Sequence, residues 1–249
     1  MRCLTSGILV VLSEMWGNSD VHPIYKQLRE GLVVSCQPVV GGPLDTPDIV
    51  ARFALAALSG GANGLRIEGV ANLRAVRRVT AVPIIGLIKS DRTDTAVRIT
   101  SMIKDVSLLA LAGADIIAFD STDRPRPVER EALVEKIHEH GKLAMADCSS
   151  SADAREAARL GCAVLGSTMS GYVGASVPLE PDFALVQAAA EFGKFVVAEG
   201  RYNRPDLAAQ AIRAGADAVV VGSAITRPEH ITSWFAQGIR DAKTQRSDS

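Results

Sequence analysis

With 249 residues, 47% of them hydrophobic and 22% charged, the chain has the composition of a globular protein with an ample core. Its net charge of −1 and its lack of any basic run provide no field for nucleic acid or an anionic membrane surface, so we expect neither partner. Cys3, Cys36, Cys148 and Cys162 lie far apart and form no CxxC pair, which argues against zinc and against a redox dithiol. Thiols of this kind are typical of the cytoplasm, where we place the protein.

The amino end, residues 1–30, is predicted to be an extension that closes with a short helix around Ile24–Glu30. Its apolar run Gly7–Leu12 follows Arg2, as in a secretory signal peptide. The run is too short to span a bilayer, and no small-residue cleavage pattern follows it. We therefore expect a loosely attached extension or an early start codon rather than an export signal.

A first strand and a first helix follow this extension. The apolar run Leu32–Cys36 is predicted to be the strand, and the helix is expected to run through Ile49–Leu58. Either Asp45 or Thr46 is placed to cap that helix, and Pro47 suits its first turn. A glycine-containing turn separates the two elements, as in a strand-turn-helix unit.

One pattern then recurs along the chain: a helix ends in glycine, usually with alanine next, and a run rich in β-formers follows. It reads GGANGLRI at Gly60, AGADIIAFD at Ala112, LGCAVLGST at Leu160 and AGADAVVVGS at Ala214. Glycine accepts the left-handed conformation that closes a helix, and the apolar run after it suits the next buried strand. The recurrence at similar spacing predicts a β/α repeat rather than a helical bundle.

Eight runs of this kind predict an α/β fold, a single-domain (β/α)8 TIM barrel over residues 31–243, followed by a polar tail of residues 244–249. An open doubly wound sheet would need fewer strands and usually a GxGxxG turn after the first, which this chain lacks. The predicted strands are Leu32–Cys36, Gly64–Ile67, Pro83–Ile88, Asp115–Phe119, Lys142–Ala146, Ala163–Ser167, Phe195–Ala198 and Ala218–Val221.

The stretch Pro83–Arg92, PIIGLIKSDR, ends an unbroken apolar run in a single cation, Lys89. In such a barrel the carboxyl ends of the strands carry the catalytic groups, so we interpret this lysine as a candidate for chemistry. The alternative is a lysine that merely begins a solvated loop. Polar residues at the other strand ends favour the first interpretation, because barrel closure brings them to one rim. They are Gln37, Arg66, Glu68, Asp120, Asp147, Thr168, Glu199, Arg201 and Ser223.

The last two predicted strands end in AEGR, Ala198–Arg201, and in VGSAITRP, Val221–Pro228. Barrels frequently bind phosphate with the loops after strands seven and eight, where free backbone N–H groups point at the anion. The alternative is that these glycines only permit tight turns. The residues predicted to approach a phosphate are Gly200, Gly222, Ser223 and Arg227.

From about Leu32 to about Trp234 the chain closely resembles the N-acylglucosamine-6-phosphate 2-epimerase family. The resemblance is carried by the ordered motifs VSCQP, RIEGVANL, PIIGLIK, TDRPRP, LAMADCS, AEGRYN and VGSAITRPEHI. It implies a cytoplasmic isomerase that converts N-acetylmannosamine 6-phosphate to N-acetylglucosamine 6-phosphate during bacterial sialic-acid and aminosugar breakdown. It also implies no cofactor and no metal.

By this resemblance, Lys89 matches the catalytic lysine and Glu199 its partner glutamate. Gln37, Arg66 and Asp147 fall on positions that contact substrate. The positions that correspond to the phosphate end are Gly200, Arg201, Gly222, Ser223 and Arg227.

Epimerisation beside an aldehyde requires a base that removes the C2 proton, a donor that returns one to the other face, and stabilisation of the enolate. Lys89 is the candidate for proton transfer, and a lysine that titrates near 10.4 must fall to roughly 7 to 8 to act as a base at neutral pH. Desolvation and Arg66 lower this pKa, whereas an adjacent Glu199 raises it. Our hypothesis is that Glu199 exchanges or orients the proton of the lysine while Arg66 and the phosphate contacts hold the sugar.

Two other functions stay open. A strand-end lysine in a phosphate-binding barrel also suits a Schiff-base aldolase, and a sugar-phosphate-binding regulator without activity would keep the same pocket. No catalytic role is expected of His230 in the last helix. Trp234 and Phe235 are expected either to pack that helix on the barrel or to form a subunit contact in a homodimer.

Overall fold

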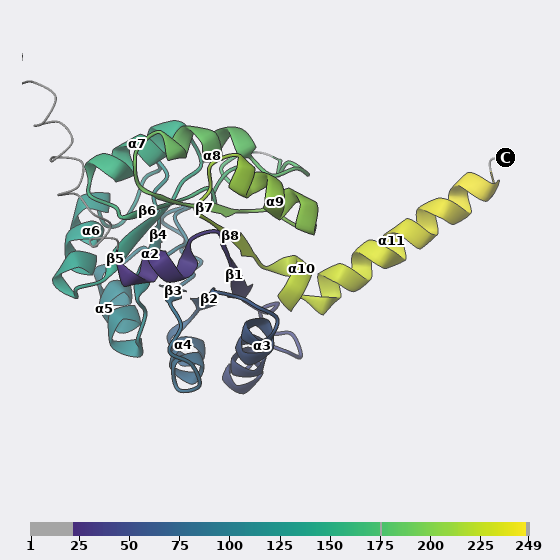
Figure 1. Ribbon diagram of the computed structural model, residues 1–249, viewed down its shortest axis with the longest axis horizontal. Coiled ribbons are helices and arrows are strands. Elements are labelled where there is room, and N and C mark those ends of the chain that lie inside the picture. The colour runs from purple at the N-terminus through teal and green to yellow at the C-terminus, as the bar shows by residue number, and fades with distance from the viewer. Residues whose placement is uncertain (1–21, 175, 248–249) are drawn as a thin grey trace, which may run out of the picture.

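The structure is a computed structural model that describes residues 22–174 and 176–247. The predicted extension is therefore described only from residue 22 onward, and its signal-like run Gly7–Leu12 and Cys3 lie outside the described residues. The chain forms the predicted (β/α)8 barrel, in which each strand is parallel to its neighbours (Figure 1).

The eight strands form a closed sheet in chain order, and β1 pairs with both β2 and β8. The register at the closure places Leu32 beside Val219 and Val33 beside Gly64. Every predicted strand is present, with its ends shifted by a few residues at most. The strands are β1 (Gly31–Cys36), β2 (Gly64–Glu68), β3 (Ile84–Leu87), β4 (Ile116–Asp120), β5 (Leu143–Asp147), β6 (Val164–Gly166), β7 (Phe195–Glu199) and β8 (Ala218–Val221).

Helices surround the sheet, and local sequence signals account for their ends. Thr46 is the residue that caps the first barrel helix, since its hydroxyl accepts from the Ile49 N–H, while Asp45 instead accepts from the Gly41 N–H. The helices are α2 (Pro23–Leu28), α3 (Pro47–Ser59), α4 (Val70–Arg77), α5 (Ile103–Ala112), α6 (Arg130–Glu139), α7 (Ser151–Arg159), α8 (Phe183–Ala190), α9 (Pro205–Arg213), α10 (Ser223–Thr226) and α11 (Pro228–Ser247).

The recurring glycines close helices as predicted. Gly61, Gly113, Gly161 and Gly215 each follow a helix with φ of +99°, +101°, +88° and +105°, a conformation that a side chain would strain. Each turn delivers the chain into the next strand. The motif that recurs in the sequence therefore marks the points where helices end and strands begin.

Side chains alternate along each strand between two apolar layers. Leu65 and Ile67 of β2 pack against the outer helices, whereas Val33, Ile85 and Met145 fill the interior of the barrel. At the amino end of the strands α2 covers the barrel, where Tyr25 stacks on Phe195 with ring centroids 4.8 Å apart. This leaves the carboxyl end of the barrel for a site.

Helix α11 departs from the layered arrangement, because it projects away from the barrel (Figure 1). Trp234, Phe235 and Ile239 on this helix are 42%, 72% and 61% exposed. The expectation that Trp234 and Phe235 pack on the barrel is therefore wrong, and their role in a subunit contact stays a prediction. The helix also continues past residue 243, and the division into residues 1–30, 31–243 and 244–249 stays a prediction. Among the described residues, no helix is both long and apolar enough to cross a membrane.

Candidate active site

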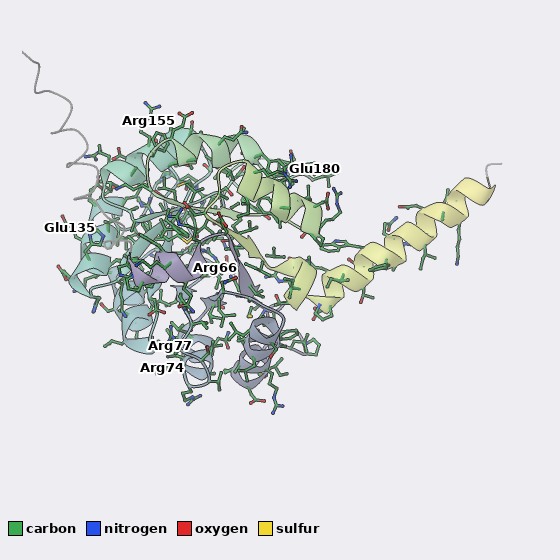
Figure 2. All side chains as sticks on the ribbon, in the orientation of Figure 1. Arg66, Arg74, Arg77, Glu135, Arg155 and Glu180 are labelled. Carbon is green, nitrogen blue, oxygen red and sulfur yellow. The ribbon has the colours of Figure 1, made fainter. Side chains whose placement is uncertain are left out.

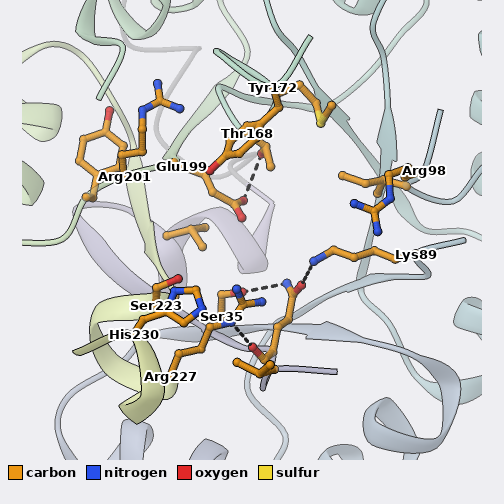
Figure 3. Close-up of a pocket in the computed structure, with 18 of the residues that line it drawn as sticks. Ser35, Lys89, Arg98, Thr168, Tyr172, Glu199, Arg201, Ser223, Arg227 and His230 are labelled. Atoms are coloured by element: carbon orange, nitrogen blue, oxygen red, sulfur yellow. Dashed lines mark hydrogen bonds between the residues drawn. The ribbon is translucent and has the colours of Figure 1, made fainter. Parts of the chain in front are cut away.

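A cavity of about 570 Å³ opens at the carboxyl end of the barrel, a volume that suits a small-molecule ligand (Figure 3). Figure 3 shows Lys89 and Glu199 approaching it from different walls, with Ser223, Arg227 and His230 gathered together on another part of its wall. The structure thus brings most of the predicted site residues to one cavity. Those that line it are Gln37, Lys89, Glu199, Gly200, Arg201, Gly222, Ser223 and Arg227.

The period of two along each strand explains which polar side chains point inward. Ile85 and Leu87 of β3 belong to the interior layer, so the next residue of the same parity is Lys89. Met145 precedes Asp147 on β5 in the same way, and Val197 precedes Glu199 on β7. The interior of the barrel is therefore apolar at its amino end and polar at the cavity.

Lys89 is held at both its backbone and its amine. Its N–H donates to Glu68 Oε1 at 3.3 Å, and it forms an antiparallel bridge with Ile99 in the loop that follows β3. Its Nζ donates to Gln37 Oε1 at 2.6 Å, and Gln37 Nε2 donates in turn to Ser35 Oγ at 2.8 Å. The amine consequently has a defined position over the cavity.

The pKa of Lys89 lies below the usual value for lysine. The main cause is the loss of solvent around the amine, which is exposed to the cavity but surrounded by its walls. The positive charges of Arg66 and Arg227 lower the pKa further, while Glu199 and Glu68 oppose the shift. The direction is the one that a lysine base requires.

Arg66 lies near the centre of the barrel, unlike the peripheral arginines Arg74 and Arg77 (Figure 2), and is 1% exposed. Its Nη2 donates to Asp147 Oδ2 at 2.6 Å and its Nη1 to Asp147 Oδ1 at 3.3 Å. Its Nε lies 3.2 Å from Glu199 Oε1, but the N–H is not aligned for a hydrogen bond. The guanidinium is thus hydrogen-bonded to Asp147 and lies within ion-pair distance of Glu199 without an aligned hydrogen bond to it.

The environment of Glu199 raises its pKa to about 7. Burial is the largest cause, and the Asp147 carboxylate adds to it. Arg66, the Thr168 hydroxyl and Lys89 act in the opposite direction. A carboxyl of this kind can hold or release a proton near neutral pH, which is the property expected of a group in proton transfer.

Arg66 and Asp147 lie beneath Glu199 and are not among the residues that line the cavity. The direct substrate contact expected of them stays a prediction. In the structure Arg66 and Asp147 contact each other, and Arg66 lies close to Glu199. Their charges act on the cavity through that carboxyl.

The loops after β7 and β8 form the opposite part of the cavity wall. Gly200 has φ of +108°, and a Cβ at Gly222 would come within 3.3 Å of Ser35, so both positions favour glycine. Arg227 is held by a hydrogen bond of 2.7 Å from its Nε to the Gln37 carbonyl, which leaves its other N–H groups for a ligand. Arg201 also lines the cavity, but its Nε and Nη1 donate to the carbonyls of Glu180 and Ser170. Its role at a phosphate stays a prediction.

Sequence reasoning missed other residues of this cavity. His230 lines it beside Ser223 and Arg227, although it belongs to α11 (Figure 3). Arg98 and Tyr172 line it from the loops after β3 and β6. These residues lie well beyond a strand end or on a helix, so the strand-end rule does not find them.

Fold and site together define a (β/α)8-barrel enzyme whose lysine faces the loops after β7 and β8 across one cavity. Residues 50–241 match the family model described as putative N-acetylmannosamine-6-phosphate epimerase. The chain belongs to this family.

Individual relatives agree with the family match. A putative N-acetylmannosamine-6-phosphate 2-epimerase of Pasteurella multocida is 54% identical over 89% of this chain and 98% of its own length. Its counterpart in Haemophilus influenzae is 55% identical over 88% of this chain and 96% of its own length. A solved structure of the N-acetylmannosamine-6-phosphate 2-epimerase from Clostridium perfringens matches with a TM-score of 0.84 and 37% identity, covering 87% of this chain and 96% of that one.

Proposed function

We propose that the protein is a cofactor-independent epimerase that interconverts N-acetylmannosamine 6-phosphate and N-acetylglucosamine 6-phosphate, in the breakdown of sialic acid and amino sugars. The observation that carries the proposal, beside family membership, is that the Lys89 amine faces the same cavity as Gly200, Gly222 and Arg227. A phosphate bound by Gly200, Gly222 and Arg227 would hold the sugar next to the Lys89 amine. The reaction needs no more than a proton acceptor, a proton donor and stabilisation of an enolate.

In this reaction Lys89, in its neutral form, removes the proton from C2, and the electron pair moves into an enolate with the C1 aldehyde. Return of a proton to the opposite face of C2 gives the epimer and restores the aldehyde. Glu199 exchanges or orients the proton of the lysine, because its own pKa lies near 7. The lowered pKa of Lys89 increases the fraction of the amine that is neutral and can accept a proton.

Proton NMR of N-acetylmannosamine 6-phosphate in heavy water tests the proposal. The C2 proton signal is expected to disappear with deuterium incorporation while the second epimer appears. Binding of the sugar without C2 exchange would contradict the epimerase and favour the regulator. Borohydride trapping of a covalent adduct on Lys89 would favour the Schiff-base aldolase instead.

Replacement of Arg227 tests whether the loops after β7 and β8 bind the phosphate group of the substrate. Arg227→Ala removes a charge-assisted contact worth about 1.5 to 3 kcal/mol, so KM for the phosphosugar is expected to rise roughly ten- to a hundredfold. Steady-state kinetics at several phosphosugar concentrations measures this change. Arg213→Ala on the exposed face of α9 is the matched control and should leave KM unchanged. An equal loss of affinity for unphosphorylated N-acetylmannosamine would show that Arg227 does not bind the phosphate.

We also propose that the protein is a homodimer in which a second copy covers α11. Ile231, Phe235 and Ile239 recur at every fourth residue, so they form one apolar stripe on a helix that projects from its own barrel (Figure 1). Phe235 and Ile239 are 72% and 61% exposed in the single chain. A twofold axis would use the same stripe in both copies.

The double variant Phe235→Glu, Ile239→Glu is expected to sediment as a monomer, because four carboxylates would be buried in the dimer. Analytical ultracentrifugation of the wild type and the variant makes the comparison. Leu111→Glu on α5, at a position that is 76% exposed, is the matched control and should keep the wild-type mass. A wild-type protein of monomeric mass would refute the dimer.

A cytoplasmic location belongs to the same proposal. Cys36, Cys148 and Cys162 are free thiols among the described residues, which suits a reducing compartment. A phosphorylated sugar is charged and does not cross membranes unaided. The net charge of −1 supports neither nucleic acid nor a membrane surface as a partner.

A further inference from the structure

Thr168 connects the two carboxyl groups of the site. It follows β6 and reaches the cavity, and its Oγ1 lies 2.8 Å from Asp147 Oδ1 and 3.1 Å from Glu199 Oε2 (Figure 3). Neighbouring residues hold this geometry. The Ser167 hydroxyl donates to the Glu199 carbonyl and accepts from the Glu199 N–H.

Gly166 makes room for this arrangement. A Cβ at this position would come within 2.6 Å of Met145 Cε, 3.1 Å of Thr168 Oγ1 and 3.3 Å of Asp147 Oδ1. A larger residue would have to move the Met145 side chain and would press on both the hydroxyl and the carboxylate. The glycine at the end of β6 therefore favours the close approach of Thr168 to Asp147.

A count of protons limits how these groups can pair. A threonine hydroxyl has one proton, so it donates to Asp147 or to Glu199 but not to both. Arg66 directs two hydrogen bonds at Asp147. If both carboxyls were ionised, one oxygen facing Thr168 would lose its hydroxyl donor, an unfavourable state in a buried site. The pairing that gives a partner to both oxygens facing Thr168 has Glu199 protonated, with Oε2 donating to Thr168 and Thr168 donating to Asp147.

Loss of the Glu199 proton permits a second pairing, in which Asp147 gives up the hydroxyl donor but keeps Arg66 as its partner. Rotation about the Cβ–Oγ bond turns the Thr168 proton from Asp147 to Glu199 Oε2. Asp147 then keeps its two hydrogen bonds from Arg66, while Arg66 Nε remains next to Glu199 Oε1. The heavy atoms need not move between the two states, and the proton released by Glu199 goes to the cavity.

Building on the epimerase proposal, we infer that Thr168 is a positioning residue whose hydroxyl reverses its hydrogen bond each time Glu199 gains or loses a proton. It thereby keeps the Glu199 carboxyl in one orientation in both states. Removal of the hydroxyl withdraws a partner from each carboxyl at once.

The charged groups around Glu199 set the direction of the expected change. Arg66 on β2 and Lys89 after β3 favour the ionised form, Asp147 on β5 opposes it, and Thr168 favours it through the hydrogen bond. Without the hydroxyl, ionised Glu199 loses its aligned donor, because the Arg66 Nε–H is not aligned with it, whereas protonated Glu199 can direct its proton into the cavity. The pKa of Glu199 is therefore expected to rise above its wild-type value of about 7. A smaller fraction of Glu199 is then ionised at neutral pH.

The test is a ¹³C NMR titration of the glutamate side-chain carboxyls in the ligand-free protein. The signal that titrates near pH 7 is assigned to Glu199 by its absence in Glu199→Gln. In Thr168→Val its midpoint is expected to rise by roughly one pH unit, and in Thr168→Ser it is expected to return to the wild-type value. In parallel, the pH profile of C2 exchange should shift in the same direction. At pH 7 kcat should be roughly fivefold lower for Thr168→Val, because a rise of about one unit from a pKa of about 7 lowers the ionised fraction of Glu199 by that factor.

Other outcomes separate the two proposals. An unchanged Glu199 midpoint in Thr168→Val, or failure of Thr168→Ser to restore it, overturns the inference. If Thr168→Val does not fold, Thr168→Ala supplies the variant without the hydroxyl. If neither variant folds, the wild-type titration decides: the absence of a glutamate signal near pH 7 overturns the inference. Absence of C2 exchange in the wild type, together with the expected titration shifts, refutes the epimerase and leaves the Thr168 hydrogen-bond reversal standing.

Discussion

Lys89→Ala is expected to lower kcat for C2 exchange by about a hundred- to ten-thousandfold, the usual contribution of a general base. The amine is the cationic group at the carboxyl end of β3, it is oriented by Gln37, and its pKa lies below that of a free lysine. Alanine removes the proton acceptor and leaves the wall formed by the loops after β7 and β8 intact. Substrate affinity should therefore fall much less than kcat.

Heavy-water NMR measures the exchange rate, and titration calorimetry with the phosphosugar measures binding to the inactive variant. Lys104→Ala, at an exposed position in the first turn of α5, is the matched control and should keep the wild-type rate. Lys89→Ala with most of its turnover would exclude Lys89 as the base.

Arg66→Met is expected to lower the free energy of unfolding by about 3 to 5 kcal/mol at neutral pH. Methionine keeps much of the side-chain volume but removes the charge that Asp147 pairs with at 2.6 Å, and Asp147 itself is completely buried. An uncompensated carboxylate then lies in the barrel next to Glu199. Urea denaturation of the variant and the wild type measures the difference.

The sign of the pH dependence follows from the same change. Without Arg66 the buried carboxyls lose the positive charge that favours ionisation, so the pKa of Glu199 rises still further above that of an unfolded carboxyl, near 4. When the pKa of a carboxyl is higher in the folded state than in the unfolded state, the protein becomes less stable as the pH rises from the unfolded-state pKa to the folded-state pKa. The deficit of Arg66→Met should thus be smaller at pH 5 than at pH 8, and a deficit independent of pH would contradict this account.

Arg52→Ala is the matched control for the loss of an arginine. Arg52 pairs with Asp48 on α3, but both side chains are 77% exposed. Exposed pairs of this kind contribute little because solvent screens them. The free energy of unfolding should change by less than about 1 kcal/mol.

The barrel and the position of its site could be predicted from short stretches of sequence. Apolar runs mark the strands, and glycines with positive φ such as Gly61 and Gly113 mark the ends of helices. Lys89 and Glu199 could be placed at the rim because each directly follows the apolar run that was predicted as a strand, Pro83–Ile88 and Phe195–Ala198. The period of two, counted from interior residues such as Leu87 and Val197, would also have predicted that both side chains point inward.

Contacts between strands could not be predicted in this way. Arg66, Asp147 and Glu199 were predicted at one rim, but not that Arg66 and Asp147 pair with each other beneath Glu199 or that Thr168 joins both carboxyls. Strand-end position says that such groups share a rim, but not which of them touch or how deeply each is buried. The register of the closed sheet decides that, and with it the pKa of Glu199.

Helix α11 illustrates the same limit. Its apolar residues predicted a buried face, either on the barrel or in a subunit contact, and the structure directs it away from its own barrel while placing His230 at the cavity. The sequence by itself determined the elements, their order and the end of the barrel that carries polar groups, because strand alternation and helix termination are local properties of the chain. Only the tertiary structure decided which charges meet and where the last helix points, because both depend on how segments far apart in the chain are brought together.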